Sequence, residues 1–271
     1  ANSGTENNPI IFKALNDKAA HLTRTGVSGV GSTMIGSYLA DGIVWDGFTI
    51  TVQSDSGDYR IPKNQFYSTD YSAIKNCDIR GGSHSEGGSI NYEGVRIEGT
   101  NHFTIENCSV YDFIETSSNH NTGAIKTYDS DNVTIKNCDV YNSTSGIYIK
   151  GYPHKTVTIE NNYVHDNSVD IMFSVGTDTA RTETGETPAN ENVSIINNVI
   201  DGLVYIDHND GGLMNDTIVR DNVFHNGMLE WCGADTGQGP TIYNNIFYHD
   251  NTSRDYQSRG VNESPLAADH K

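Results

Sequence analysis

Apolar and polar residues alternate in short runs along nearly the whole chain, and these runs repeat. Each unit follows the order apolar, polar, apolar, polar, asparagine, small, polar, apolar, as in Phe103 followed by TIENCSV (residues 104–110) and Val133 followed by TIKNCDV (residues 134–140). Alternation with a period of two residues predicts β-strands, and a polar kink between two such runs predicts a tight turn. Each unit therefore predicts a strand, a turn and a second strand.

Copies of this unit follow one another along the chain. One residue anchors each copy, in the order Trp45, Ile74, Ile105, Ile135, Ile159, Ile195, Val219 and Ile242. Successive anchors are 29, 31, 30, 24, 36, 24 and 23 residues apart. A period of about two dozen residues with variable insertions is typical of a solenoid. Helical repeats are excluded because no apolar stripe with a 3.6-residue period reaches a useful length.

A variable loop and a third alternating run follow each unit, for example GAIKTY (residues 123–128) and GIYIKG (residues 146–151). Three short strands per turn with an asparagine at one corner predict an all-β parallel β-helix of about nine coils. We predict that it spans residues 1–250, with a C-terminal tail or cap over residues 251–271. Equivalent residues of stacked coils lie about 4.8 Å apart. An asparagine ladder is therefore expected at Asn76, Asn107, Asn137, Asn161 and Asn197.

Three of the four cysteines, Cys77, Cys108 and Cys138, follow the corner asparagine in successive copies. Their side chains are expected to point the same way in stacked coils, which disfavours disulfide bridges. We interpret them as small buried thiols that fill a corner. No C-x-x-C pair is present, which argues against a zinc site.

The net charge of the chain narrows the classes of function that it can have. The chain of 271 residues has 17 Lys and Arg against 35 Asp and Glu, a formal net charge of −18. Nucleic-acid binding is excluded because a phosphate backbone requires a basic footprint. No run of about 18 apolar residues is present, so no membrane span is predicted. The first residues, ANSGTENNPIIFKAL, read as a turn feeding a strand, as expected of a mature or trimmed form.

The repeat resembles the right-handed parallel β-helix superfamily typified by pectate lyases, in its polysaccharide lyase branch. The resemblance covers nearly the whole chain and rests on the asparagine-corner unit. It implies a single-stranded right-handed solenoid whose three sheets are named PB1, PB2 and PB3. The VTI-type strands resemble PB2, the DVY-type strands PB3 and the GIYIKG-type strands PB1. In the enzymes of the superfamily the substrate lies along PB1.

Outward positions of the predicted PB1 strands gather cations and aromatic rings. The first outward row is Arg96, Lys126, Tyr148, Met172, Tyr205 and Glu230, and the second is Glu98, Tyr128, Lys150, Ser174, Asp207 and Cys232. Three cations in one patch of so acidic a chain indicate a function. They also allow a simpler interpretation, a solvated cross-strand charge set in which Glu98 balances Arg96 and Lys126.

Adjacent cations lower the pKa of a lysine, which suits a general base. We predict that Lys126 or Lys150 removes the C5 proton of a uronic acid in a β-elimination and that Arg96 binds its carboxylate. Tyr128 or Tyr148 is predicted to return a proton to the leaving oxygen or to stack on a sugar. Arg and Lys on PB1 are also what the lyase members imply. Further substrate-binding candidates are His84, His120, His154, Lys155 and Tyr205.

Calcium is a second expectation, because many lyases of the superfamily neutralise the substrate carboxylate with Ca²⁺ near PB1. The candidate ligands are Glu98 and Asp129. The segment DSDN (residues 129–132) lacks the spacing and the glycine of an EF-hand loop.

Two other function classes remain open. A glycoside hydrolase needs two carboxylates about 5–10 Å apart, whereas Glu98 and Asp207 lie four predicted coils apart, roughly 19 Å. A non-catalytic adhesin or sugar-binding β-helix is the other alternative, with the loop of residues 176–190 as a binding element. The preferred prediction is a secreted, periplasmic or cell-surface lyase that acts on an acidic polysaccharide as a monomer.

Overall fold

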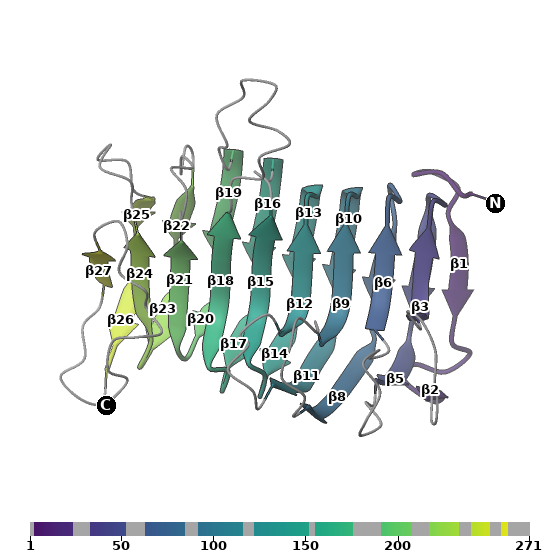
Figure 1. Ribbon diagram of the computed structural model, residues 1–271, viewed down its shortest axis with the longest axis horizontal. Helices are drawn as coiled ribbons and strands as arrows, with labels where there is room; N and C mark the ends of the chain where they lie inside the picture. Colours follow the sequence, from purple (N-terminus) through teal and green to yellow (C-terminus); the bar gives the residue numbers. More distant parts are fainter. Residues whose placement is uncertain are drawn as a thin grey trace.

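The computed structural model describes residues 3–23, 33–52, 63–84, 92–115, 122–151, 155–175, 191–207, 217–232, 240–249 and 256–259. Every regular element in these ranges is a β-strand. The strands form three parallel sheets with nine strands each in the described part of the chain. Successive coils lie side by side from the N-terminal to the C-terminal end (Figure 1). The predicted all-β parallel β-helix of about nine coils is therefore confirmed.

Each coil contributes one strand to each sheet in the order PB2, PB3, PB1. The strands of PB2 are β1 (Ile10–Lys13), β4 (Ile43–Asp46), β7 (Ala73–Lys75), β10 (Asn101–Glu106), β13 (Asp131–Lys136), β16 (Lys155–Glu160), β19 (Glu191–Ile196), β22 (Ile218–Arg220) and β25 (Thr241–Tyr243). The strands of PB3 are β2 (Ala20–Thr23), β5 (Phe48–Thr51), β8 (Asp78–His84), β11 (Ser109–Glu115), β14 (Asp139–Tyr141), β17 (Tyr163–His165), β20 (Val199–Ile200), β23 (Val223–His225) and β26 (Ile246–Tyr248). The strands of PB1 are β3 (Thr33–Tyr38), β6 (Lys63–Tyr67), β9 (Glu93–Glu98), β12 (Gly123–Tyr128), β15 (Ser145–Gly151), β18 (Val169–Val175), β21 (Leu203–Asp207), β24 (Met228–Cys232) and β27 (Tyr256–Arg259).

The last strand of PB1 lies in the predicted C-terminal tail or cap. Tyr256–Arg259 pairs in parallel with β24, and the predicted division of the chain at residue 250 stays a prediction. The predicted boundary after residue 250 comes before this strand. The loop of residues 176–190, predicted as a binding element, lies outside the described residues.

The asparagine corner between PB2 and PB3 forms as predicted. Asn76, Asn107, Asn137, Asn161 and Asn197 all have positive φ, between 53° and 61°. Asparagine tolerates this left-handed conformation better than most residues, which explains its place at the turn. Amides of neighbouring coils are hydrogen-bonded: the distance is 3.2 Å from Asn107 Nδ2 to Asn76 Oδ1 and 3.0 Å from Asn197 Nδ2 to Asn161 Oδ1.

The cysteine column beside this corner continues as a second, buried asparagine ladder. Cys77, Cys108 and Cys138 are free and buried, as predicted. In the later coils the same position is taken by Asn162, Asn198, Asn222 and Asn245. Each asparagine of this column accepts a backbone N–H from the preceding coil and donates to a carbonyl there. The column thus satisfies backbone groups that the corner would otherwise bury unpaired.

The core is one continuous apolar column of isoleucine, valine and phenylalanine from all three sheets. Thr127 interrupts it, between Ile97 and Ile149 on the adjacent strands. Its side chain is fully buried and its Oγ1 has no hydrogen-bond partner.

We expect Thr127→Val to raise the free energy of unfolding by about 1 kcal/mol, because it removes an unsatisfied buried hydroxyl at nearly constant volume. The measurement is the urea midpoint at constant slope. Thr134→Val on the outer side of PB2 is the matched control and should change stability by less than about 0.5 kcal/mol. Equal shifts of the urea midpoint in both variants would contradict the interpretation that the buried Thr127 hydroxyl destabilises the fold.

Candidate functional site

The register of PB1 brings the predicted site residues together on three adjacent strands. Arg96 of β9 pairs with Lys126 of β12, and Lys126 pairs with Tyr148 of β15. In the second outward row, Tyr128 lies between Glu98 on one side and Lys150 on the other. Both rows follow the register that the repeat predicts.

Arg96, Lys126 and Lys150 form a cluster of positive charge, here called the cation cluster, around two tyrosine rings. Arg96 Cζ lies 4.3 Å from the centroid of the Tyr128 ring, and Lys126 Nζ lies 5.0 Å from it. Lys126 Nζ and Lys150 Nζ lie 4.9 and 5.6 Å from the centroid of the Tyr148 ring. These distances are within the range of attraction between a cation and an aromatic face. The rings therefore hold the cations close together despite their mutual repulsion.

A carboxylate that the sequence analysis did not include, Glu93, joins two of these cations. Its Oε1 lies 2.7 Å from Arg96 Nη1 and 3.4 Å from Lys126 Nζ. The side chains of Glu93 and Lys126 are both 0% exposed, and that of Arg96 is 11% exposed. A second carboxylate, Glu98, accepts a 2.8 Å hydrogen bond from Arg96 Nε. Arg96 thus binds two glutamates of its own strand.

Burial changes the pKa of Lys126 more than its charged neighbours do. Desolvation is the largest cause that lowers the pKa of Lys126, to about 7, and Lys150 and Arg96 lower it further. Glu93 opposes this shift because a nearby negative charge favours the ammonium form. The sequence analysis predicted a lowered pKa from like charges, whereas the structure adds burial as the main cause. A lysine amine with such a pKa is partly neutral near pH 7, as a general base must be.

The pKa values of Lys150, Tyr128 and Arg96 also shift, and the different directions suit these side chains to different roles. Burial lowers the pKa of Lys150, and Arg96 adds to this effect while Glu93 opposes it. Burial raises the pKa of Tyr128 to about 12 although Arg96 opposes it, so this phenol is protonated at neutral pH. Burial alone would lower the pKa of Arg96, but Glu93 and Glu98 outweigh it and the pKa rises.

Not all predicted substrate-binding residues come to this cluster. Tyr205 lies two strands beyond Tyr148, is 2% exposed and packs in an apolar cluster with Val169 and Leu203. His84 ends β8 in PB3 and Lys155 begins β16 in PB2, so neither strand belongs to PB1. His120 and His154 lie outside the described residues. Their predicted roles stay predictions.

Glu98, one of the two predicted calcium ligands, is hydrogen-bonded within the protein. The carboxylate of Glu98 binds Arg96 Nε and, at 3.3 Å, Gln65 Nε2. Within the same part of the chain no three His, Cys, Asp or Glu side chains are placed to hold a metal ion. Glu98 and Asp129 alone do not supply the six to eight oxygen ligands that Ca²⁺ takes. Calcium stays a prediction, and no chemical step below depends on it.

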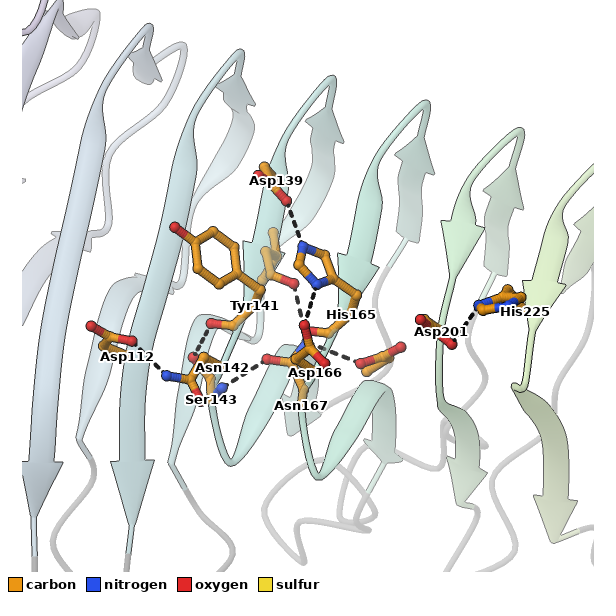
Figure 2. Close-up of polar contacts among 12 residues, drawn as sticks. Asp112, Asp139, Tyr141, Asn142, Ser143, His165, Asp166, Asn167, Asp201 and His225 are labelled. Atoms are coloured by element: carbon orange, nitrogen blue, oxygen red, sulfur yellow. Dashed lines mark hydrogen bonds and ion pairs between the residues drawn. The ribbon is translucent and has the colours of Figure 1, made fainter. Parts of the chain in front are cut away.

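A second polar network lies on PB3 and its following turn (Figure 2). His165 is held between two carboxylates, with Nε2 3.0 Å from Asp139 Oδ1 and Nδ1 2.7 Å from Asp166 Oδ2. Two coils farther toward the C-terminus the arrangement partly recurs, with His225 Nδ1 3.0 Å from Asp201 Oδ1 (Figure 2). Tyr141 stacks on the His165 ring at 5.1 Å between centroids. Face-to-face stacking covers the ring faces that a sugar would need, so this network reads as coil-to-coil support.

Asp170, which follows the turn after β17, makes the stability of the fold depend on pH. It is fully buried, its Oδ1 accepts a 2.9 Å hydrogen bond from Asn167 Nδ2, and its Oδ2 has no hydrogen-bond partner. Burial raises the pKa of Asp170 to about 7, against the hydrogen bonds from Asn167. An acid whose pKa is higher in the folded than in the unfolded state destabilises the fold progressively as pH rises from about 4 to about 7, and this destabilisation remains above pH 7.

We therefore expect Asp170→Asn to be about as stable as the wild type at pH 4 and more stable at pH 8. The difference should grow by at most about 1.4 kcal/mol per pH unit between these limits. Urea unfolding of both proteins across this pH range measures it. A stability difference that does not change with pH would contradict the prediction.

A separate surface hollow lies on the outer side of PB2 and contains none of the predicted site residues. Its volume is about 500 Å³, and its walls include Tyr71, His102, Lys75 and Thr134. Tyr71 and His102 stack on each other at 4.7 Å between centroids. Volume alone does not indicate chemistry, so the functional argument rests on the buried charges of PB1.

Residues 40–262 match the family model described as the right handed beta helix region. The chain belongs to the right-handed β-helix family. No curated protein is similar enough in sequence to count as a match to this β-helix. Within the described ranges, no helix is long and apolar enough to cross a membrane.

Solved structures similar to this β-helix include enzymes and an adhesin. Pectate lyase Pel9A is 13% identical with a TM-score of 0.49, over 99% of this chain and 66% of that one. An alginate lyase from Paenibacillus sp. str. FPU-7 is 15% identical with a TM-score of 0.48, over 90% and 92% of the two chains. PfbA, a surface adhesin of Streptococcus pneumoniae, is 11% identical with a TM-score of 0.41, over 95% and 79%. At such identities the likeness concerns the fold and leaves function to the site.

Strict alternation explains why sequence reasoning missed Glu93. Val95 faces inward, so a period of two places Glu93 inward as well. In the structure residue 94 also faces the core: a Cβ on Gly94 would meet the Phe113 ring at 2.6 Å. The alternation slips at Gly94 and turns Glu93 toward Arg96 and Lys126 on the outer side. The sequence signal was the glutamate itself, next to a run that carries an arginine.

Proposed function

We propose that this β-helix cleaves an acidic, uronic-acid-containing polysaccharide by β-elimination on the outer face of PB1, outside the cell. The observation that supports it most is Lys126, a fully buried lysine whose pKa is lowered to about 7 within a cluster of cations and tyrosines. Buried groups with strongly shifted pKa values cluster at functional sites, and a general base requires this partly neutral state.

The proposed reaction uses groups that the site holds. The neutral amine of Lys126 takes the proton from C5 of the uronic acid, the electrons of that bond form the C4–C5 double bond, and the bond between C4 and the glycosidic oxygen breaks. The leaving oxygen takes a proton from a tyrosine. Tyr128 fits this acid role because its pKa of about 12 keeps it protonated. Lys126 ends with one proton more and the tyrosine with one fewer, so water restores both.

The carboxylate of the sugar must be neutralised for the C5 proton to become acidic enough. Arg96 already binds Glu93 and Glu98, so its charge is largely matched within the protein. Lys150 is only partly buried, and its Nζ lies over the Tyr128 and Tyr148 rings, 5.9 and 5.6 Å from their centroids. We assign most of the carboxylate binding to Lys150 and a supporting part to Arg96. Calcium, if bound, would add positive charge at the same carboxylate.

Hydrolysis has weaker support. Two carboxylates lie close to each other on β9, but Arg96 bridges them: its Nη1 binds Glu93 and its Nε binds Glu98. A hydrolase needs the sugar or a water molecule in that space and one protonated carboxyl group. No described contact favours the adhesin alternative over catalysis.

The test is incubation of the protein with pectate, alginate and a glycosaminoglycan, with calcium supplied. A lyase produces an unsaturated uronide at the new chain end, which absorbs ultraviolet light, whereas a hydrolase produces only new reducing ends. Unsaturated product from at least one polymer is the expected result. Reducing ends without unsaturation would favour the hydrolase, and neither product would favour the binding protein.

A further inference from the structure

One carboxylate on PB1 has no part in the proposed reaction yet contacts its central residue. Glu93 is completely enclosed, and its Oε1 lies between Arg96 Nη1 at 2.7 Å and Lys126 Nζ at 3.4 Å. Enclosing a carboxylate is costly unless cations and hydrogen bonds compensate for its lost hydration. Glu93 and the two cations of the first outward row therefore compensate for one another's lost hydration.

The backbone is arranged to present Glu93 to the cations. Residue 94 faces the core, where a Cβ would collide with the Phe113 ring and with the Ala124 carbonyl at 2.5 Å. Only glycine fits there, so the side chain before it turns to the outer side. Directly across the strand pair from Glu93 lies Gly123, where an added Cβ would meet Tyr148 Cβ at 3.4 Å. Gly123 thus brings no side chain of its own into the space beside Tyr148.

We propose that Glu93 is a positioning residue of this site: it holds Arg96 and Lys126 side by side and sets the charge that Lys126 carries near neutral pH. The inference rests on the proposed function for the role of Lys126. Without the carboxylate, Lys126 would still be buried next to Lys150 and Arg96, and all three effects disfavour its ammonium form. It would lose the negative charge of Glu93, which favours that form. The amine would then stay neutral to lower pH.

A matched pair of variants separates this role from general support of the site. Glu93 and Glu98 lie on the same strand and both bind Arg96, but only Glu93 contacts Lys126 among the described ion pairs. We compare Glu93→Gln with Glu98→Gln. The readout is the titration of the Lys126 side-chain nitrogen by NMR of protein with ¹⁵N-labelled lysine, assigned by Lys126→Arg.

In the wild type the midpoint is expected near 7. It should fall by about one pH unit or more in Glu93→Gln, as expected for loss of an opposite charge within 4–6 Å. In Glu98→Gln it should move by no more than about 0.3 units, since that carboxylate does not contact the amine. An unchanged or raised midpoint in Glu93→Gln, or equal shifts in both variants, would overturn the proposal. If Glu93→Gln does not fold, Glu93→Asp retains the charge at a greater distance and should give a smaller downward shift, and no shift there would overturn the proposal as well.

Catalysis gives a second readout. If the lyase reaction is found, the acidic limb of the kcat/KM profile should move to lower pH in Glu93→Gln by the same amount as the NMR midpoint. A purely structural role would lower the rate at all pH values without moving the limb. The NMR titration needs no substrate. Absence of lyase activity would therefore contradict the proposed function, whereas the titration would still test the coupling of Glu93 to Lys126.

Discussion

Lys126→Ala is expected to lower kcat on a cleaved uronate polymer by a factor of about 10²–10⁴, the usual contribution of a general base. The physical reason is that Lys126 combines full burial, a pKa near 7 and contact with both tyrosine rings. Lys150→Ala should act differently, raising KM more than it lowers kcat, because Lys150 is assigned to carboxylate binding. Initial rates of unsaturated product formation measure both.

Lys136→Ala is the control. This lysine lies on the outer side of PB2, 31% exposed, and pairs with Glu106 at 3.2 Å. A partly exposed pair of this kind contributes little to stability, and its sheet is not PB1. Activity should therefore equal that of the wild type. If Lys126→Ala and Lys136→Ala are equally active, the cation cluster is not the catalytic site.

Asn198→Ala is expected to destabilise the solenoid by roughly 2–5 kcal/mol, the largest stability effect that we predict. Its Oδ1 accepts the backbone N–H of Asn162 at 2.9 Å, and its Nδ2 donates to the carbonyl of Ile159 at 2.9 Å. Nδ2 also lies 3.0 Å from Asn222 Oδ1. Alanine leaves buried backbone groups of the preceding coil without partners and interrupts the ladder. The urea midpoint and the slope of unfolding measure the loss.

Its sequence neighbour Asn197 supplies the matched control. Asn197 belongs to the outer ladder, where its Nδ2 donates to Asn161 at 3.0 Å near the surface, and its φ is 61°. Asn197→Gly keeps the left-handed backbone accessible and loses only this exposed bond, so its effect should stay below about 1 kcal/mol. A larger loss in Asn197→Gly than in Asn198→Ala would show that the outer ladder carries the stability.

The sequence alone determined the solenoid, its nine coils and the rows of PB1. Each of these follows from a repeat whose period of two is local, so the pairing of Arg96 with Lys126 and of Tyr128 with Lys150 needed no knowledge of the packing. The outer asparagine ladder was predictable for the same reason. The buried one was visible only as a second asparagine in the later copies, where the first copies have cysteine.

Only the tertiary structure decided what the cations of PB1 contact and how buried they are. The slip of alternation at Gly94 depends on the Phe113 ring, which comes from another sheet, and it turns Glu93 outward. The full burial of Lys126 is the main cause of its lowered pKa, and the alternation of its own strand predicts only an outward side chain. A repeat fixes the direction of a side chain relative to its neighbours in sequence, whereas burial and charge pairing depend also on residues far away in the chain.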